Sequence, residues 1–588
     1  MAHLSEDSVK LSITNAVIEN HNDLRRFTSG FNDVCILRLP SVSLKEQDCR
    51  IENIGQYIAE VAGLLGDNAT LITVGEPIDL VAVHEAIEAT AIYQSWIAIK
   101  RATVLYAENK TVLPDQHFGA LIHTRYKGSL RHTKTRIGYT YCPACDKTTK
   151  DYGGKKHIYH EYGTLMSDVW RDIKCDLEGN IDIILERFAD FFGIESYKEL
   201  RVLDCRPIFQ TRKQVLPQAA KFNIQIQSLP NELQNTLLNE DCLTALKTIP
   251  DNSIDFTFVD PPYNLKKKYS GYSDDLEITD YFSWCDEWLY ELARTLKQGR
   301  ICAVLNIPLY AIRHFRFLET VLNFQGWIAW DALSFPVRLL MPAHYSILLF
   351  SKGDPRQLTD LNIDKDQDTQ HILPLGENYC LRANCIDKRN RSIVKDRGEL
   401  TNLWSDIHRL KHNTRRVDHP CQLPPSLMYR LISLFTNEGE NVLDCFDGAG
   451  TTTLTAHQLN RNYLGIEKDA TYHKLAKSRH DEINAGLDPF RKVERVLTVK
   501  NSPMPRMPKQ KYDVPKKTLQ LEVKRVSEIL DRMPSREDMS QLGKYPIEYY
   551  DKYFHSWGEV CAAARNTGMS ENRNNQQAEQ LSLFKHTT

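Results

Sequence analysis

A carboxylate, two prolines and a tyrosine follow directly on an apolar run at one point of the sequence. The run is DFTFV at 255–259, and the four residues are Asp260, Pro261, Pro262 and Tyr263. The aspartate is a hydrogen-bond acceptor, and the prolines fix φ and donate no N–H of their own, so acceptors at this point are held still. Asp and Pro are also ordinary turn formers, so a surface turn without chemistry is the alternative.

A second motif, VLDCFDGAGTT at 442–452, is typical of a glycine-rich turn between a strand and a helix. Gly448 and Gly450 let the backbone approach a ligand closely, and Glu467, after the next apolar run, can accept both hydroxyls of a ribose. The glycine spacing is not GxGxxG, and no Gly-Lys-Ser/Thr follows, which argues against a dinucleotide or a triphosphate. The motif predicts a nucleoside-cofactor site.

Both motifs lie in a region where short apolar runs alternate with amphipathic stretches. From about residue 226 to 487, runs such as DFTFV, RICAVLN, YSILLFS and NVLDCF alternate with stretches such as YFSWCDEWLYELARTL at 281–296. This alternation is typical of an open α/β sheet. We expect residues 226–490 to form the domain that carries the chemistry.

The first half of the chain repeats the pattern of the second half in the same order. The offsets run from 222 residues, for Asp33 over Asp255, to 240 residues, for Val202 over Val442. The matching pairs are NDVCILRLPS and SIDFTFVDPPY, ATLITVGEP and RICAVLNIP, HFGALIHTRYKG and HYSILLFSKG, SDVWRDI and TNLWSDI, and the two VLDC runs. Any two α/β domains share apolar strands, which is the alternative explanation. We predict that residues 1–225 form a second copy of the sheet.

This first copy lacks the residues that carry the chemistry. The run RLPS at 38–41 stands where the second half has Asp260 to Tyr263, and VLDCRPIF at 202–209 stands where it has VLDCFDGAGTT. We interpret the first copy as degenerate and inactive, with a structural or substrate-binding role.

The second half closely resembles the DNA amino-methyltransferases, which use S-adenosylmethionine to methylate an exocyclic base nitrogen. The residues that carry the resemblance are NEDCLTALKTIPDNSIDFTFVDPPYN at 239–264, HPCQLPPSLMYRLI at 419–432 and NVLDCFDGAGTT with YLGIEKD at 441–469. The Asp-Pro-Pro-Tyr motif precedes the glycine-rich motif, as in the β class of that family. The resemblance implies an α/β, Rossmann-like methyltransferase sheet, S-adenosylmethionine as cofactor and double-stranded DNA as substrate.

The resemblance also implies roles at the catalytic motif. Asp260 and the carbonyl of Pro261 accept the two N–H bonds of the amine, and Tyr263 stacks on a base flipped out of the duplex. Because the amine lone pair is delocalised into the ring, these acceptors draw the nitrogen toward tetrahedral geometry as it attacks the methyl group. Asp at the first position favours adenine N6, and cytosine N4 is the enzymatic alternative. A DNA-binding protein that senses S-adenosylmethionine without turnover is the alternative from another class.

On the donor side, the family pattern carries over to eight positions. By resemblance the donor site comprises Asp241, Asp444, Phe446, Gly448, Gly450, Thr451, Glu467 and His419. Asp447 stands where the family more often has a small residue, and Leu423 stands where a lysine is frequent. The role of Asp447 and a lost charge at Leu423 are open questions at the level of sequence.

Basic residues mark the predicted contact with DNA. The family places its target-recognition region at 355–418, where a charge run otherwise indicates a solvated face. The candidates are Arg389, Arg391, Arg409, Arg415 and Arg416, together with Lys266, Lys267 and Lys268 after the catalytic tyrosine.

A Cys-x-x-Cys pair in the first half resembles half of a structural zinc site. Cys142 and Cys145 are followed by His157 and His160, but four ligands at a recognised spacing are missing. Two buried thiols in a reduced loop are the favoured alternative, and no catalytic metal is expected.

Beyond the catalytic domain we expect three further segments. Residues 491–518 are a basic, proline-rich linker. Residues 519–568 are similar to the helical DNA-binding repeats appended to homing endonucleases. The aromatic residues of this repeat either form its own small core or stack on bases. The polar tail 569–588 is expected to be disordered. In that tail Gln580, Leu581, Leu583 and Phe584 resemble the peptide by which bacterial replication proteins dock on the sliding clamp.

The charge balance and the cysteine count restrict how the protein can bind DNA and where in the cell it is expected. With 74 Lys+Arg against 76 Asp+Glu, DNA must be met by local basic patches. Fourteen cysteines without a dense framework, a start without a signal pattern and no long apolar run predict a cytoplasmic protein without a membrane segment, from a prokaryotic cell or a phage. Because the family often works as dimers, we expect the first half to replace a second subunit in an intramolecular pseudo-dimer, within a monomer or homodimer of a restriction-modification enzyme.

Overall fold

The computed structural model describes residues 12–41, 49–107, 110–126, 130–133, 135–148, 163–193, 197–209, 211–213, 225–264, 276–332, 343–359, 380, 382, 384–386, 398–410, 422–490, 514, 516–530, 532–554, 556–561 and 563–564. Within these residues, no helix has the length and apolar character needed to cross a bilayer.

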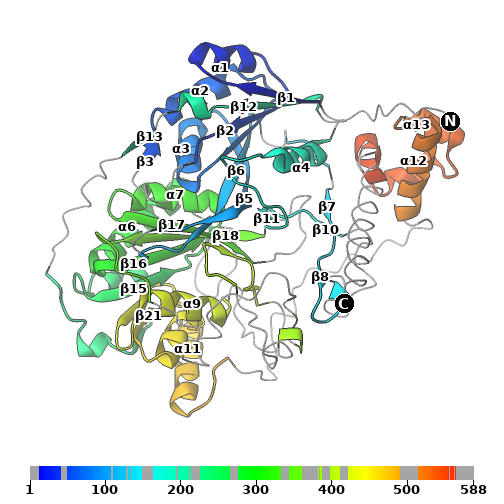
Figure 1. Ribbon diagram of the computed structural model, residues 1–588. Coiled ribbons are helices and arrows are strands. Elements are labelled where there is room, and N and C mark those ends of the chain that lie inside the picture. The colour runs from blue at the N-terminus through cyan, green and yellow to red at the C-terminus, as the bar shows by residue number, and fades with distance from the viewer. Residues whose placement is uncertain are drawn as a thin grey trace, which may run out of the picture.

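The second half forms an eight-stranded sheet (Figure 1). Its strand order is β14-β21-β20-β15-β16-β18-β17-β19, with β14, β21, β20, β15 and β16 mutually parallel and β18 antiparallel to both of its neighbours. The strands are β14 (Thr236–Leu238), β15 (Ile254–Val259), β16 (Leu296–Asn306), β17 (Asn323–Asp331), β18 (His344–Ser351), β19 (Leu403–Trp404), β20 (Asn441–Asp444) and β21 (Asn462–Ile466).

Helices cover both faces of this sheet, so strands β15 and β20 are buried along their whole length. These helices are α5 (Cys242–Leu246), α6 (Ile278–Thr295), α7 (Pro308–Leu318), α9 (Pro425–Phe435), α10 (Thr451–Gln458) and α11 (Ala470–Asn484). Strand β15 shows why: Val259 packs into the cluster with α6 and α7, whereas Phe256 and Phe258 pack into the cluster with α9. A parallel strand that is covered on both sides reads as a continuous apolar run.

The first half forms a seven-stranded sheet in the order β1-β12-β2-β4-β6-β5-β11. Its strands are β1 (Ser12–Val17), β2 (Val34–Arg38), β4 (Thr70–Gly75), β5 (Ile92–Leu105), β6 (Asp115–Thr124), β11 (Val169–Trp170) and β12 (Glu199–Asp204). The helices are α1 (His21–Thr28), α2 (Ile54–Leu64), α3 (Pro77–Ile87) and α4 (Asp182–Phe192), and the short strands are β3 (Cys49–Ile51), β7 (Arg136–Ile137), β8 (Tyr141–Cys142), β9 (Lys147–Thr148), β10 (Thr164–Leu165) and β13 (Thr211–Lys213).

Six consecutive strands have the same order in the two sheets, which confirms the predicted repeat of the fold. The order β12-β2-β4-β6-β5-β11 in the first half matches β20-β15-β16-β18-β17-β19 in the second, and each matched segment of sequence lies on the corresponding strand. The copies differ at one edge. In the second half β21 lies between β14 and β20, whereas in the first half β1 pairs directly with β12.

Equivalent elements of the two halves meet at a shared interface. Helix α3 contacts α7, and the ring of Trp96 on β5 stacks on that of Trp327 on β17, with centroids 4.8 Å apart. Both tryptophans are almost fully buried, in an apolar cluster drawn from both halves. Because the two occupy equivalent positions in the repeat, this contact lies where the axis of a two-fold dimer would pass.

A reciprocal pair of hydrogen bonds has the same symmetry. The Asp168 carboxylate, beside β11, accepts the backbone N–H of Ala343 at 2.8 Å, before β18. In the equivalent place, the Asn402 side chain, beside β19, accepts the N–H of Gln116 at 2.8 Å, in β6. The same surface on each half therefore contacts the other, as in an isologous dimer interface.

The C-terminal helices form a small core of their own. They are α12 (Lys516–Leu530), α13 (Arg536–Leu542) and α14 (Ile547–Asp551). Tyr550 and Phe554 are buried in this core, and Ser535 and Asp538 form the predicted capping box. Helix α12 begins inside the stretch predicted as linker, because the Lys516 ammonium bonds to the carbonyl of Tyr553 and joins the helical module.

Candidate active site

Four polar residues gather where adjacent strands of the second sheet end. Asp260 follows β15, Asn306 ends β16, Asp444 ends β20 and Glu467 follows β21. These strands are parallel neighbours, so their carboxyl ends lie along one edge. This edge is where open α/β sheets bind ligands.

The Asp-Pro-Pro-Tyr turn is held by hydrogen bonds from several sides. The Tyr263 hydroxyl donates to the Asp260 carboxylate at 2.6 Å, and the Tyr281 hydroxyl on α6 donates to the carbonyl oxygen of Pro262 at 2.8 Å. Asn264, with φ of 52°, bonds through its side chain to both the N–H and the carbonyl of Leu276. Sequence reasoning did not single out Tyr281, whose only signal was its place on the apolar face of a predicted helix.

Aromatic rings extend this turn along the sheet edge. The ring of Tyr263 lies 6.2 Å from that of Tyr345, which in turn lies 5.6 Å from Trp330. The guanidinium of Arg409 lies over the Tyr345 ring at 5.2 Å. Among the basic residues predicted to contact DNA, Arg409 is the one that the structure describes, and through Tyr345 it lies next to the Asp-Pro-Pro-Tyr turn.

The glycine-rich turn has the backbone that its composition predicts. Gly448 and Gly450 have φ of 53° and 81°, in the left-handed region, and a Cβ at Gly450 would lie 2.9 Å from Cβ of Ala476. Asp444 accepts the N–H of Phe446 at 2.9 Å, and Glu467 accepts the N–H groups of Gly448 at 2.9 Å and Asp469 at 2.7 Å. The carboxylates thus fix the loop that would contact a cofactor.

The other described residues of the predicted donor site lie in this loop or near it. Phe446 packs edge-on against Trp284 and Trp288 of α6 and stays half-buried. Asp241 caps α5 by accepting the N–H of Leu243, and its carboxylate forms an ion pair with Lys468 at 3.1 Å. Thr451 is buried at the start of α10.

Asp447, whose role was open, points away from this edge into the protein. Its carboxylate accepts a hydrogen bond from Thr453 at 3.0 Å, and a Cβ at Gly465 would lie 2.7 Å from it. Thr453 in turn contacts His480, whose ring bonds to His457. Burial, together with repulsion from Asp444, raises the pKa of Asp447 well above its usual value. We infer that this acid is structural.

The sheet edge is electrostatically suited to a cationic ligand. Burial, with repulsion from Asp260 and Glu467, raises the pKa of Asp444 to about 7, although Thr452 and the N–H of Phe446 donate to it. Burial likewise raises the pKa of Glu467. A sulfonium placed between these acids would remove the repulsion, so the residues present fit S-adenosylmethionine.

The corresponding corner of the first half is filled by arginines. Arg38, in the position of Asp260, is buried and donates to the carbonyl of Leu177 at 2.9 Å. Arg206, in the position of Phe446, forms ion pairs with Asp204 at 2.6 Å and Glu178 at 2.8 Å. No acceptor for an amine stands at the Arg38 position.

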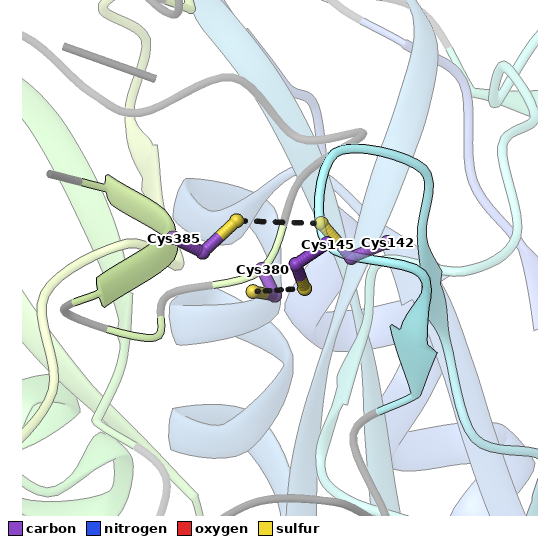
Figure 2. Close-up of side chains that lie close together, drawn as sticks. All are labelled: Cys142, Cys145, Cys380 and Cys385. Atoms are coloured by element: carbon purple, nitrogen blue, oxygen red, sulfur yellow. Dashed lines mark hydrogen bonds between the residues drawn. The ribbon is translucent and has the colours of Figure 1, made fainter. Parts of the chain in front are cut away.

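Two residues of the zinc candidate, Cys142 and Cys145, lie beside two cysteines that the sequence did not single out. The thiols of Cys142 and Cys145 lie beside those of Cys380 and Cys385 (Figure 2). The remaining predicted site residues lie outside the described residues: His419, Lys266, Lys267, Lys268, Arg389, Arg391, Arg415, Arg416, His157, His160, Gln580, Leu581, Leu583 and Phe584.

Comparison with known proteins assigns two segments of the chain. Residues 254–478 match the family model described as a DNA methylase, and residues 514–564 match the homing endonuclease associated repeat. Over 234 residues the chain is 33% identical to the type II methyltransferase M.BamHI of Bacillus amyloliquefaciens, a match that spans 39% of this chain and 54% of that protein.

Other relatives are matched over more of their length. The type II methyltransferase M.HpaI of Haemophilus parainfluenzae is 33% identical over 262 residues, which is 44% of this chain and 77% of that protein. The DNA adenine methyltransferase YhdJ of Escherichia coli (strain K12) is 28% identical, over 42% of this chain and 82% of its own. Among solved structures, the cytosine-N4-specific PvuII DNA methyltransferase is similar at 20% identity and a TM-score of 0.30, over 43% of this chain and 89% of its own.

Proposed function

The chain belongs to the DNA methylase family, and from this premise we propose that its second half transfers a methyl group from S-adenosylmethionine to N6 of adenine in duplex DNA. The observation that carries the proposal is the turn at Asp260 to Tyr263, which presents acceptors at the sheet edge beside the glycine-rich loop.

The amine of adenine needs acceptors more than it needs a strong base. Asp260 accepts one N–H and the Pro261 carbonyl accepts the other, so the nitrogen lone pair is freed for attack on the methyl carbon. The N–CH₃ bond forms as the S–CH₃ bond breaks, and the amine then loses one proton to Asp260 or to solvent. Tyr281 and Tyr263 hold the turn so that these acceptors do not move.

The donor supplies an electrophilic methyl group on a sulfonium, and the chain supplies its surroundings. Phe446, Gly448 and Gly450 form the wall and floor of the loop. Glu467 accepts two backbone N–H groups, and its remaining lone pairs can accept hydrogen bonds from the ribose hydroxyls. Asp241, at the start of α5, would accept a hydrogen bond from the adenine amine of the donor.

Adenine is favoured over cytosine by the aspartate at the first catalytic position. Serine is the residue that favours cytosine there in this family, and the PvuII enzyme named above is cytosine-N4-specific. Cytosine N4 is therefore the second candidate, and a donor-sensing protein without turnover is the third.

One experiment separates these candidates. Full-length protein is incubated with isotopically labelled S-adenosylmethionine and duplex DNA of mixed sequence, and the nucleosides are resolved by mass spectrometry. We expect label in N6-methyladenine, and a loss of about 10²- to 10⁴-fold in rate for Asp260→Ala, with donor binding by calorimetry retained. Asp280→Ala, which removes an exposed carboxylate of α6, is the matched control and should keep the rate. Label in N4-methylcytosine, or none on diverse DNA, would overturn the proposal.

The other segments are proposed to bring DNA to this site. We propose that the first half, with its blocked corner, stands in for the second subunit of a dimeric methyltransferase, and that region 355–418, with Arg409 next to the catalytic turn through Tyr345, reads the target. The C-terminal repeat would add affinity for duplex DNA. The tail peptide at Gln580 to Phe584 would bind a sliding clamp, which loss of clamp binding after truncation at residue 579 would test.

A further inference from the structure

Four cysteine thiols from distant parts of the chain converge at one point between the two halves. Cys142 and Cys145 lie on the β8–β9 hairpin, and Cys380 and Cys385 lie in the segment between β18 and β19. All four sulfurs lie within 4.8 Å of one another, with 3.9 Å between Cys142 and Cys385 and 3.7 Å between Cys145 and Cys380 (Figure 2).

These distances fit metal ligands better than disulfides. A bonded pair of sulfurs is about 2.05 Å apart, whereas a tetrahedron with Zn–S bonds of about 2.3 Å has sulfur–sulfur edges of roughly 3.8 Å. None of the four is joined to another described cysteine by a disulfide bond.

Among the residues that the structure describes, the thiols are also not part of an ordinary apolar core. The cluster that contains Cys142, Cys380 and Cys385 is separate from the cores of the two sheets, and its other members are Cys145 and Ala144. A packed core normally joins six or more apolar neighbours around each buried side chain. Among the described residues, four sulfurs and the methyl group of Ala144 make up this cluster, so apolar packing there is small and a bound ion would add binding energy between the two segments.

The repeat shows that the two pairs come from equivalent places. Cys142 and Cys145 lie in the connection from β6 to β11, and Cys380 and Cys385 lie in the connection from β18 to β19. These strands correspond in the two sheets, since both connections leave the antiparallel middle strand and return at the last strand of the sheet. Each half thus contributes two ligands from the same insertion point.

We propose that Cys142, Cys145, Cys380 and Cys385 bind one structural Zn²⁺ ion. This ion joins the β6–β11 connection of the first half to the β18–β19 connection of the second. Four thiolates without an open position are typical of a structural rather than a catalytic zinc site. The β18–β19 connection belongs to the region proposed to read the target, so the metal would fix that region against the first half. The metal site itself does not depend on the proposed methyl transfer, because its test measures metal and not activity.

The first test is the metal content of the full-length protein. After dialysis against a weak chelator, elemental analysis should give one zinc per chain, and the double variant Cys380→Ala/Cys385→Ala should give almost none. Cys175→Ala, which removes a buried thiol of the first half outside the cluster, is the matched control and should keep its zinc. Iron in place of zinc, a zinc content that the double variant retains, or disulfides among the four cysteines after purification under reducing conditions would overturn the proposal.

A second test needs no variant that must fold. Metal-free wild-type protein is titrated with Co²⁺, and the visible spectrum should show the intense bands of tetrahedral cobalt with four thiolates, saturating at one equivalent. Bands of octahedral cobalt alone would overturn the proposal.

Hydrogen exchange tests whether the ion joins the two halves. On zinc removal, peptides that cover 141–148 and 384–386 should both exchange faster, although they lie in different halves of the chain. An increase confined to one of these segments would show that the ion is not shared.

Discussion

Burial, with a smaller repulsion from the carboxylates of Asp260 and Glu467 at the same sheet edge, raises the pKa of Asp444 to about 7. The ordinary value for this group is 3.8. In the free protein this acid is therefore part-protonated at neutral pH, and a cationic donor would favour its ionised form. The repulsion is a cost in the free state that a sulfonium relieves on binding.

The pH dependence of donor binding follows from that shift. Below pH 7, Asp444 must lose a proton before it can attract the sulfonium, so affinity should fall as the pH falls, by at most about tenfold per unit. Calorimetry from pH 5.5 to 8, in buffers of different ionisation enthalpy, should show proton release that fades above pH 7. Asp444→Asn, which keeps an acceptor for the N–H of Phe446, should bind more weakly at pH 8 and show a flatter profile.

The same variant has a predicted effect on stability. An acid whose pKa is raised on folding makes the folded state less favourable as the pH rises from 3.8 to about 7. Asp444→Asn should therefore raise the melting temperature of the donor-free protein at pH 8 and change it little at pH 4. A lower melting temperature at pH 8 would contradict the assigned shift.

At the scale of elements, the glycine-rich turn depends on its backbone conformation and on the helix packed behind it. Gly450 caps α10 in the left-handed region, and Ala476 of α11 leaves no space for a Cβ. These two constraints explain a glycine at this position in different ways, one through φ and one through contact.

A matched pair of variants separates the two effects. Gly439 has a similar φ of 76° with nothing within 4 Å of an added Cβ, so Gly439→Ala should cost about 1 kcal/mol through φ alone. Gly450→Ala should destabilise by about 1–2 kcal/mol more and should weaken donor binding, because α10 and the loop must shift. Urea unfolding and calorimetry measure both quantities. Equal destabilisation of the two variants would show that Ala476 yields without cost.

At the scale of the whole molecule, the interface makes the two halves one unit. Asp168 accepts the N–H groups of Ala343 at 2.8 Å and His344 at 3.2 Å, both buried. Asn402 does the equivalent for Gln116 in the other direction. Because Asn402 already accepts a backbone N–H at one of the two equivalent places, asparagine is the conservative substitution for Asp168 at the other.

Asp168→Ala should leave buried N–H groups without an acceptor and destabilise the protein by about 2–4 kcal/mol. Asp168→Asn should cost about 1 kcal/mol or less, since the amide oxygen can accept the same bonds. The midpoint of urea unfolding, followed by tryptophan fluorescence because Trp96 and Trp327 lie at the interface, checks both. If the two variants were equally destabilised, the loss would come from charge rather than from the interface hydrogen bonds.

The sequence alone determined the features that are contiguous along the chain. These features depend on local backbone preferences and on periodicity, which neighbouring residues specify. They are the apolar run before Asp260, the glycine turn at 448–450, the capping box at Ser535 and the five matched segments of the repeat. The strand order of both sheets confirms the repeat, and the family match confirms the DNA methylase resemblance.

Only the tertiary structure decided which distant side chains meet. Tyr281 reaches Pro262, Arg38 fills the position of the missing acid, and Cys142 and Cys145 meet two cysteines more than 230 residues away, whereas the histidines named from sequence lie outside the described residues. Spacing along the chain does not specify these pairings, because loops of variable length separate the partners and the packing of two symmetric sheets brings them together.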